Sequence, residues 1–400
     1  MMAQWTNIST GKIGKAHLVW AVSEDSIIAT GNHGKMYYSH DGGQTFDSIT
    51  TIFNFGEWFS DLQFSSSGKG YFCGGTAFGN YSNFLASTDD VGLTWDSLTS
   101  NQFAGSSFNQ IDFLTDDIGF IRGDNDLLLK TLDAGQSFSQ VPIPLGARIN
   151  SVSIVDSQTC FISTSEFDLT GISNYRILKS IDQGNTWREV YLNSIIGNSF
   201  SSYKNINSFH FSNSMMGHAV GNNGIVLKTI DGGENWSVQT LVNDSTFFMD
   251  VYFINENLGF ALGIYAFAGN SRSSWTTNDG GKNWTKDSYS FTSISFANDS
   301  LGYAIQNGVI FKTTKAGNIG QNENKTSPLA LFPNPIASGE FLNLENIGDS
   351  KTIEIYDALG RLMMKKTYEG AFPLTKFQAG IYYIKIDGNS NRLAPFIVVE

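Results

Sequence analysis

Short apolar runs separated by polar turns recur along most of the chain, and they share one pattern. An apolar residue, any residue and Phe come first, and a polar turn and then Gly-aromatic-Ala follow. Three copies are Phe209–Phe211 with Gly217–Ala219, Val251–Phe253 with Gly259–Ala261, and Ile294–Phe296 with Gly302–Ala304. A further apolar run, such as Ile225–Thr229, leads into a second polar turn. Each repeat therefore predicts four short β-strands, A to D.

The second polar turn has a signature of its own. Ser or Thr is followed two positions on by Asp, two further by Gly, and three further by an aromatic residue. The central residues are Asp41, Asp90, Asp133, Asp182, Asp231 and Asp279, with Lys315 at the same place in a seventh copy. Most copies are separated by roughly 43 to 49 residues. Repeats of this length with four strands are typical of a β-propeller, in which blades packed around an axis bury both faces of each sheet.

The six aspartates are predicted to be structural turn residues. Asp at the start of a turn accepts hydrogen bonds from N–H groups a few residues on, and Gly adopts the positive φ that the turn needs. The aromatic residue then opens strand D and buries a large apolar area. One Asp in each blade cannot form the paired acid and base of a glycosidase.

The two ends of the repeat region predict how the propeller closes. No aromatic strand follows the seventh turn, whereas the N-terminal segment around Trp5 reads as a strand D without a turn before it. The N-terminus is therefore predicted to supply the outer strand of the last blade. The predicted all-β architecture is a seven-bladed propeller over residues 1–317, a linker over 318–327 and a small β-sandwich over 328–400.

These turns resemble the Asp-box, or BNR, repeats of sialidases, xyloglucanases, sortilin-type receptors and photosystem II assembly-factor-like propellers. The resemblance extends over about residues 4–317 and is specific for the fold. It is a poor guide to function, because the family includes enzymes and non-enzymes alike.

The C-terminal segment carries three motifs in order. They are Pro333-Asn334-Pro335, Tyr356-Asp357 followed by Gly360, and Gly380 followed by Tyr382. This segment resembles the type A sorting domain of the type IX secretion system, although Glu400 stands where that family often has a basic residue. The resemblance implies recognition by the secretion machinery and export through the outer membrane of a Bacteroidetes-like bacterium, to the cell surface or beyond. An ordinary fibronectin-like module is the alternative interpretation.

Composition excludes several classes of partner and site. A net charge of −12 disfavours nucleic acid, and no apolar run approaches the length of a membrane span. Cys73 and Cys160 lie in apolar runs of different blades, which predicts two free, buried thiols. The five histidines lack metal-ligand spacing, so no metal or cofactor is expected. Met1–Ala3 reads as the end of a signal peptide cleaved after Ala3.

Long loops predict a binding face on the side of the propeller opposite the Asp turns. They are the B–C loops over 76–83, 165–174 and 264–273 and the D–A connections over 53–58 and 191–203. Their candidate ligand-binding residues are Phe55, Trp58, Phe78, Tyr81, Phe167, Tyr203, Tyr265, Phe267 and Arg272. Aromatic rings among Asn and Ser suit a glycan or an extracellular protein. The alternative is that these rings only hold the loops in place.

Support for catalysis is weak. A sialidase needs an arginine triad, and the nearest match to its first motif, Tyr175–Leu178 around Arg176, lacks the proline. The carboxylates on the loop face that could form a pair are Glu57, Asp61, Glu166 and Asp168. We therefore expect a secreted, non-catalytic module that binds glycan or protein, and assign no catalytic residue. A glycan-active enzyme, sialidase-like or another glycoside hydrolase, is the alternative, and a scaffold role in the cell envelope is a third.

Overall fold

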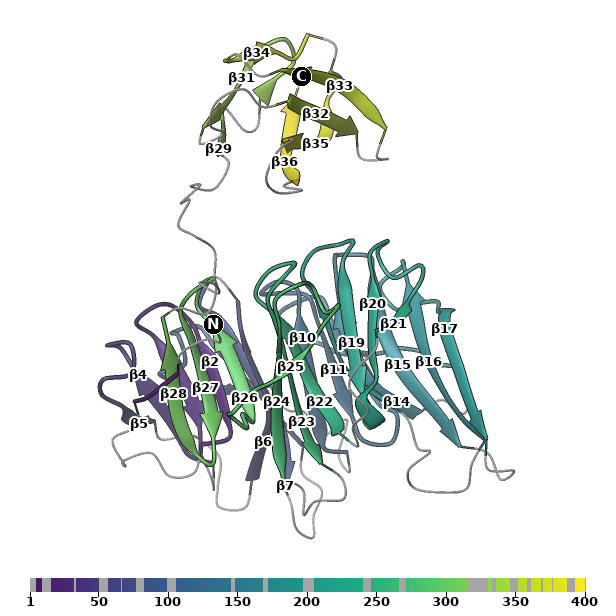
Figure 1. Cartoon of the computed structure of the whole chain (residues 1–400). Coiled ribbons are helices and arrows are strands. Elements are labelled where there is room, and N and C mark those ends of the chain that lie inside the picture. The colour runs from purple at the N-terminus through teal and green to yellow at the C-terminus, as the bar shows by residue number, and fades with distance from the viewer. Residues whose placement is uncertain are drawn as a thin grey trace. The chain divides into compact units, whose positions relative to one another are not determined.

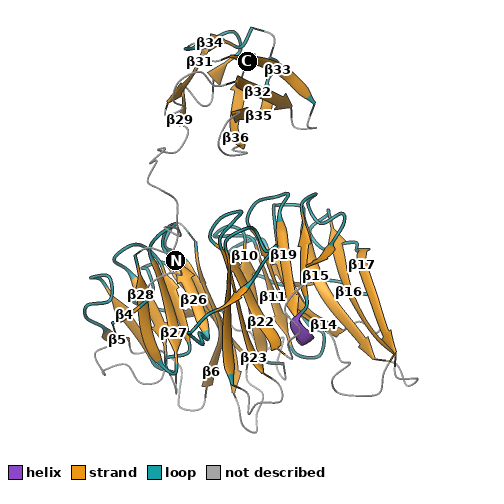
Figure 2. Ribbon diagram, viewed as in Figure 1, coloured by secondary structure: helices purple, strands orange, loops and turns teal. Residues whose placement is uncertain are grey.

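The computed structural model divides the chain into two compact units, Met1–Ile319 and Gly320–Glu400. The described residues are 5–8, 16–31, 34–49, 57–65, 67–76, 83–98, 106–144, 148–167, 172–196, 205–239, 246–265, 271–314, 330–332, 336–345, 352–357, 361–367, 370–375, 377–386 and 393–399. They form strands, turns and loops, with one single-turn 3-10 helix, η3 (Asn222–Gly224) (Figure 2). The predicted linker over 318–327 lies outside the described residues, so the domain boundaries stay a prediction.

The described part of the first unit contains seven four-stranded antiparallel sheets (Figure 1). The A strands are β2 (Leu18–Ala21), β6 (Glu57–Phe64), β10 (Phe108–Phe113), β14 (Arg148–Ile154), β18 (Ile206–Phe211), β22 (Thr246–Phe253) and β26 (Ser293–Phe296). The B strands are β3 (Ile27–Thr30), β7 (Gly70–Thr76), β11 (Gly119–Gly123), β15 (Cys160–Phe167), β19 (Gly217–Gly221), β23 (Gly259–Tyr265) and β27 (Gly302–Gln306). A strands of neighbouring sheets contact one another, which makes them the inner strands.

The other two strands complete each sheet. The C strands are β4 (Met36–Ser39), β8 (Asn83–Thr88), β12 (Leu128–Thr131), β16 (Ile172–Ser180), β20 (Val226–Thr229), β24 (Arg272–Thr277) and β28 (Val309–Thr313). The outer D strands are β5 (Asp47–Ile49), β9 (Asp96–Ser97), β13 (Ser139–Gln140), β17 (Arg188–Ile196), β21 (Ser237–Gln239), β25 (Thr285–Lys286) and, from the N-terminus, β1 (Thr6–Asn7). The predicted all-β propeller is therefore confirmed.

Seven apolar clusters lie between successive sheets and join them in a ring. One example is the cluster that brings Phe161 and Tyr175 of one blade against Phe209 and Trp236 of the next. The corresponding clusters connect the other neighbouring pairs, including the last blade with the first. Each sheet thus buries both faces, which a single repeat could not do alone.

The predicted closure by the N-terminus is confirmed. Strand β1 pairs with β28, with Thr6 opposite Lys312 and Asn7 opposite Phe311. Trp5 is only 7% exposed. Its ring packs edge-on against Phe291, with ring centroids 4.9 Å apart. The first residues of the propeller therefore complete its last blade.

The glycine of the Gly-aromatic-Ala pattern is explained by a contact within each blade. In five blades the last Phe of the A strand lies directly opposite the Gly that opens the B strand. A Cβ on that Gly would lie 2.3–2.5 Å from a carbon of the phenyl ring, so only glycine fits. The pairs are Phe64 with Gly70, Phe113 with Gly119, Phe211 with Gly217, Phe253 with Gly259, and Phe296 with Gly302.

In three of these blades the aromatic residue after this glycine stacks on the A-strand Phe of the next blade. The ring of Tyr71 lies 3.6 Å from that of Phe113, and the ring of His218 lies 3.8 Å from that of Phe253, both nearly parallel. Phe113, Phe253 and Phe296 are thus each enclosed between a glycine of their own blade and an aromatic ring of the previous one. His218 serves here as a packing residue, and its other contact is a hydrogen bond of Nε2 with the carbonyl oxygen of Gly280 at 3.1 Å.

Polar side chains of the inner strands also connect neighbouring blades. Gln63 donates to the carbonyl oxygen of Phe113 at 2.9 Å and accepts from its N–H at 2.7 Å. Gln110 makes the same pair of bonds with Val152. Single hydrogen bonds also join neighbouring blades. In each, a backbone N–H donates to a side chain of the blade before it: Ile111 to Asp61, Ile154 to Asp112, Val19 to Ser293, and Ala21 to Ser295. These bonds supply polar partners where no strand ladder joins the blades.

The second unit is a small β-sandwich, as predicted. One sheet has the order β29 (Ala330–Phe332), β31 (Phe341–Glu345), β34 (Phe372–Pro373), and the other β30 (Ile336–Ala337), β36 (Leu393–Val399), β35 (Gly380–Ile386), β32 (Thr352–Asp357), β33 (Leu362–Thr367). A single buried cluster that includes Leu342, Ile355 and Ile384 fills the space between them.

The described motif residues have structural contacts within the second unit. Asp357 Oδ1 accepts the N–H of Arg361 at 2.9 Å, which closes the turn after β32. Gly380 begins the long strand β35, and the hydroxyl of Tyr382, its third residue, donates to the carbonyl oxygen of Gln378 at 3.0 Å. The Tyr356 hydroxyl donates to Glu354 at 2.6 Å. The motif residues Pro333, Asn334, Pro335 and Gly360 lie outside the described residues.

Candidate functional site

The six Asp turns have the same hydrogen-bond geometry in every copy. In the turn of Asp182, the Ser180 hydroxyl accepts the N–H of Gly184 at 2.8 Å. One oxygen of Asp182 accepts the N–H of Thr186 at 2.8 Å, and the other accepts the Thr186 hydroxyl at 2.7 Å. Equivalent bonds to Asp41, Asp90, Asp133, Asp231 and Asp279 measure 2.8–3.0 Å from the backbone and 2.5–2.8 Å from the side chain.

These hydrogen bonds favour the ionised form of the turn aspartates. Hydrogen bonds from Thr186 lower the pKa of Asp182 to about 2, and the corresponding Thr45 bonds lower the pKa of Asp41 well below its usual range. Donors that favour the ionised form keep the carboxylate charged at every physiological pH. Such groups are poor general acids, because they do not hold a proton.

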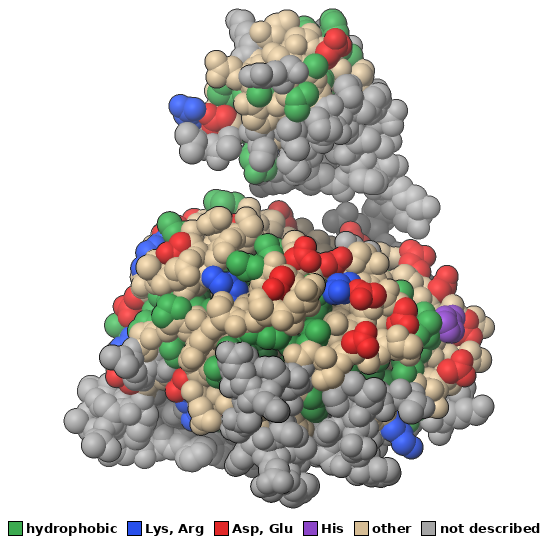
Figure 3. Space-filling model, turned by 180° about the vertical axis from the view of Figure 1, so that it is seen from behind, with side chains coloured by type: hydrophobic (Ala, Val, Ile, Leu, Met, Phe, Trp, Pro, Cys, Tyr) green, Lys and Arg blue, Asp and Glu red, His purple; other side chains and the backbone are tan. Residues whose placement is uncertain are grey.

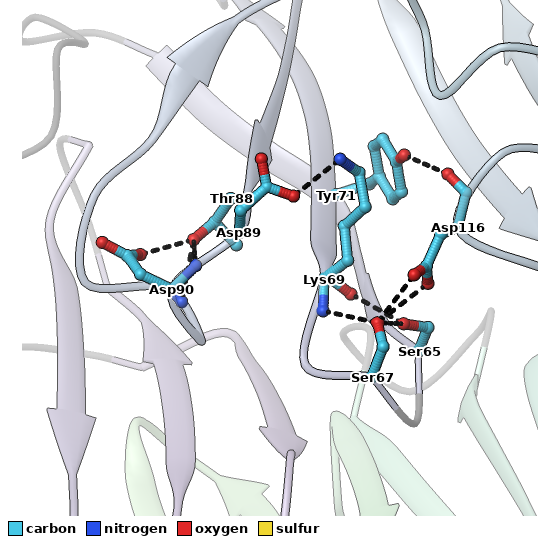
Figure 4. A network of polar contacts seen from close by, with 9 residues as sticks. Ser65, Ser67, Lys69, Tyr71, Thr88, Asp89, Asp90 and Asp116 are labelled. Atoms are coloured by element: carbon cyan, nitrogen blue, oxygen red, sulfur yellow. Dashed lines mark hydrogen bonds and ion pairs between the residues drawn. The ribbon is translucent and has the colours of Figure 1, made fainter.

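The turn of Asp90 belongs to a larger network that reaches the next blade (Figure 4). Lys69 forms an ion pair with Asp89 at 2.7 Å. The Tyr71 hydroxyl donates to the carbonyl oxygen of Asp116, and the Ser67 hydroxyl donates to the Asp116 carboxylate at 2.8 Å. These polar residues therefore connect the turn of Asp90 with neighbouring turns of its own blade and of the next blade.

Four lysines that sequence reasoning missed connect neighbouring Asp turns. Each lies one residue before the Ser or Thr of its own turn and donates to a backbone carbonyl in the turn of the following blade, at 2.6–3.0 Å. They are Lys130 to Gln183, Lys179 to Gly232, Lys228 to Gly280, and Lys312 to Gly42. The recurrent Lys before Ser or Thr was the available signal, but its partner lies 52 or 53 residues away in three cases and 270 residues away for Lys312.

Replacing Lys179 with Met should lower the free energy of unfolding by about 1.5–3 kcal/mol, because a charged donor bonded to a carbonyl is lost. Lys179 is buried and also contacts Glu234 at 2.7 Å. Lys282→Met, at an exposed position of another turn, is the matched control and should change stability by less than about 0.5 kcal/mol. Chemical denaturation measures both, and equal effects would contradict a specific role for Lys179.

Arg176, the arginine nearest to a sialidase motif, is held by two carboxylates. Its Nη1 lies 2.7 Å from Glu166 on β15, and its Nε lies 3.0 Å from Glu189 on β17. The guanidinium thus bridges the two strands that flank its own strand, β16. A substrate carboxylate would have to displace these partners to reach it.

The predicted carboxylate candidates are not brought together. Asp61 lies on the inner strand β6, and Glu166 lies two blades away on β15, where it binds Arg176. Asp168 and the side chain of Glu57 lie outside the described residues. The described residues therefore contain no pair made from this set.

Two carboxyl groups on inner strands, those of Asp61 and Asp112, have raised pKa values. Burial raises the pKa of both Asp61 and Asp112 to about 7, against the opposing effect of backbone N–H donors. Part of each side chain is exposed to solvent, and solvent screening reduces the contribution of these raised pKa values to the stability of the fold. In the unfolded chain these carboxyls titrate near 4.

Because the folded state binds the Asp112 proton more tightly, its contribution to stability should be largest in acid and should fall as the pH rises from about 4 to about 7. Asp112→Asn stays neutral and removes this dependence. Thermal unfolding at pH 5 and pH 8 should therefore show the melting temperature of the variant gaining on that of the wild type as the pH rises. A constant difference between the two would contradict the raised pKa.

Most residues of the predicted aromatic binding face, or their side chains, lie outside the part of the chain that the structure describes. Phe55, Phe78, Tyr81, Tyr203 and Phe267 lie outside the described residues, as do the side chains of Trp58 and Phe167. The backbones of Trp58 and Phe167 lie in β6 and β15, and Tyr191 lies in β17. The predicted loops over 53–58, 165–174 and 191–203 were too long. Strands β6, β15, β16 and β17 continue into these ranges, because strand pairing extends past the expected turns.

Tyr265 and Arg272 are the two candidates with described side chains. Tyr265 ends β23, and Arg272 begins β24 as an exposed side chain. The Lys286 ammonium lies 4.3 Å from the centre of the Tyr265 ring and donates to its hydroxyl. The two candidates thus mark the ends of adjacent strands of one blade, with a cation beside the aromatic ring.

Within the described residues, no group of His, Cys, Asp and Glu has the arrangement of a metal site. Cys73 and Cys160 are free and buried, and burial raises the pKa of the Cys160 thiol to about 12. No helix of the described part has the length and apolar character needed to cross a bilayer. Asp and Glu side chains are scattered over the propeller surface seen in Figure 3, with fewer Lys and Arg among them.

Comparison with solved structures identifies β-propellers. YCF48 bound to a D1 peptide has a TM-score of 0.57 at 17% identity, covering 79% of this chain and 99% of that chain. YCF48 from Cyanidioschyzon merolae has a TM-score of 0.54 at 15% identity, covering 78% and 99%. The extracellular domain of the putative one-component system BT4673 from B. thetaiotaomicron has a TM-score of 0.57 at 11% identity, covering 99% and 58%. At these identities the likeness concerns the fold.

Comparison of sequences identifies the second unit. Residues 330–400 match the family described as the secretion system C-terminal sorting domain. No curated protein sequence matches the chain. The chain is thus a β-propeller protein that carries a type IX secretion sorting domain and is exported to the cell surface or the surroundings of the cell.

Proposed function

We propose that the propeller is a non-catalytic binding module for a glycan or an extracellular protein, delivered outside the cell by its sorting domain. The observation that carries this proposal is the engagement of Arg176 by Glu166 and Glu189. The arginine nearest to a sialidase motif is instead paired with two carboxylates of its own blade.

The ionisation of the Asp turns supports the same function. Their carboxylates accept bonds from their own turns, and the pKa of each lies below its ordinary value. They suit a rigid frame, and a rigid frame is the usual support for loops that bind ligands.

Aromatic residues of the loop face would supply the contacts to the ligand. Tyr265, with Lys286 beside it, presents a ring, a hydroxyl and a cation at one place. Rings of this kind stack on sugars and pack against peptides, while the polar groups fix orientation. YCF48, which shares the fold, is a propeller whose structure includes a bound peptide.

A triple variant, Trp58→Ala, Tyr81→Ala and Tyr265→Ala, should lose retention on immobilised glycans or extracellular proteins by at least about tenfold. Its melting temperature should stay within a few degrees of the wild type if the residues serve binding. The control Tyr289→Ala alters a residue that packs against Phe291 and should reduce stability instead. Full retention by the triple variant would remove the loop face from consideration.

A further inference from the structure

The outer strand β17 differs from the other outer strands of the propeller. It spans nine residues, Arg188–Ile196, whereas the other six described D strands have two or three. Its partner β16 also has nine residues, and the register runs without a break from Ile172 opposite Ile196 to Ile177 opposite Tyr191, after which a β-bulge at Val190 precedes the pair of Leu178 with Glu189. The two strands form the long hairpin at the right of Figure 1.

Strand β17 is the edge of its sheet in the described residues, which pairs it with β16 alone. Long edge strands are usually shortened, charged or covered, because their free N–H and C=O groups pair with other chains. This strand has the sequence REVYLNSII, which is rich in residues with high β propensity and carries one Arg and one Glu that cancel in charge. Each of these features favours pairing with another strand.

We infer that β17 pairs antiparallel with β17 of a second copy of this chain, which joins two blades into one eight-stranded sheet. Leu192 is the middle residue of the nine, and 47% of its surface is exposed. A two-fold axis at Leu192 pairs Tyr191, Leu192 and Asn193 of one strand with Asn193, Leu192 and Tyr191 of the other, on the side of the Val190 β-bulge where the strand is regular, and places the two exposed leucines opposite each other. A strand whose exposed apolar residue lies at its midpoint is therefore complementary to itself.

Local charge does not oppose this register, although the chain has a net charge of −12. Arg188 and Glu189 lie at one end of β17, so the like charges of the two copies stand about 25 Å apart. That separation is about three Debye lengths at physiological salt, and repulsion between them is screened. Arg176, directly opposite Leu192 on β16, is already neutralised by Glu166 and Glu189.

The first test is the mass of the full chain in solution, measured by sedimentation at about 1 to 100 μM, because a single strand pair is a small interface. The wild type should shift from monomer to dimer over this series. Leu192→Asp places two carboxylates at the two-fold axis and should stay monomeric, while the exposure of position 192 lets the monomer fold. Val238→Asp is the matched control, since Val238 is 64% exposed on the short outer strand β21, and it should dimerise like the wild type.

The second test fixes the register. Leu192→Cys should form a covalent dimer under mild oxidation, since residues directly opposite have Cβ atoms about 4.5–5.5 Å apart. Val238→Cys should not, and the native Cys73 and Cys160 are buried. A wild type that stays monomeric at every concentration overturns the inference and leaves the edge for an extended segment of a different protein. A dimer that Leu192→Asp does not weaken also overturns it.

Discussion

Replacing Trp5 with Ala should lower the free energy of unfolding by about 3–5 kcal/mol, the usual loss for a large aromatic side chain in a core. Trp5 contacts Phe260, Phe291 and Phe296, so its ring lies where the last two blades meet. Deleting residues 1–10 should cost more, because the pairing of β1 with β28 is lost as well. Thermal and chemical unfolding measure both changes.

Thr6→Ala is the control for this prediction. Thr6 is exposed and pairs with Lys312 through its backbone, so the substitution should leave stability within about 0.5 kcal/mol of the wild type. An unchanged melting temperature after deletion of residues 1–10 would show that the propeller does not depend on closure by the N-terminus.

Replacing Phe253 with Ala should have an effect of similar size, about 3–5 kcal/mol. Its ring covers Gly259 of its own blade, stacks on His218 of the previous blade and meets Trp284 edge-on at 5.9 Å. The variant leaves a cavity between two blades, and glycine opposite it offers no side chain to fill the space.

Met249→Ala is the control for Phe253, because Met249 lies on the same strand and is 53% exposed. Chemical denaturation should show a loss of less than about 0.5 kcal/mol for this variant. A small loss at Phe253 would contradict the role given to stacking between blades.

Local patterns sufficed to predict the fold. The turn signature predicted strands C and D, and Trp5 without a turn before it predicted the closure that β1 and β28 make. These signals are local because strand propensity, turn chemistry and the aromatic after each turn act within about ten residues.

Contacts between blades could not be predicted in this way. Lys179 reaches Gly232, and Gln110 reaches Val152, across about one repeat, but no local pattern indicates which side chains of neighbouring blades meet. The raised pKa of Asp112 likewise arises from burial, which depends on how the inner strands converge. The length of β17 was also missed, since Tyr191 was assigned to a connection and instead lies in the strand.

Incubating the purified chain with a broad panel of oligosaccharides and extracellular proteins tests the central claim most directly, with retention and product mass read together. We predict that a ligand is retained and that its mass is unchanged, as the proposed binding function requires. Shortened oligosaccharides would contradict this and establish a glycan-active enzyme.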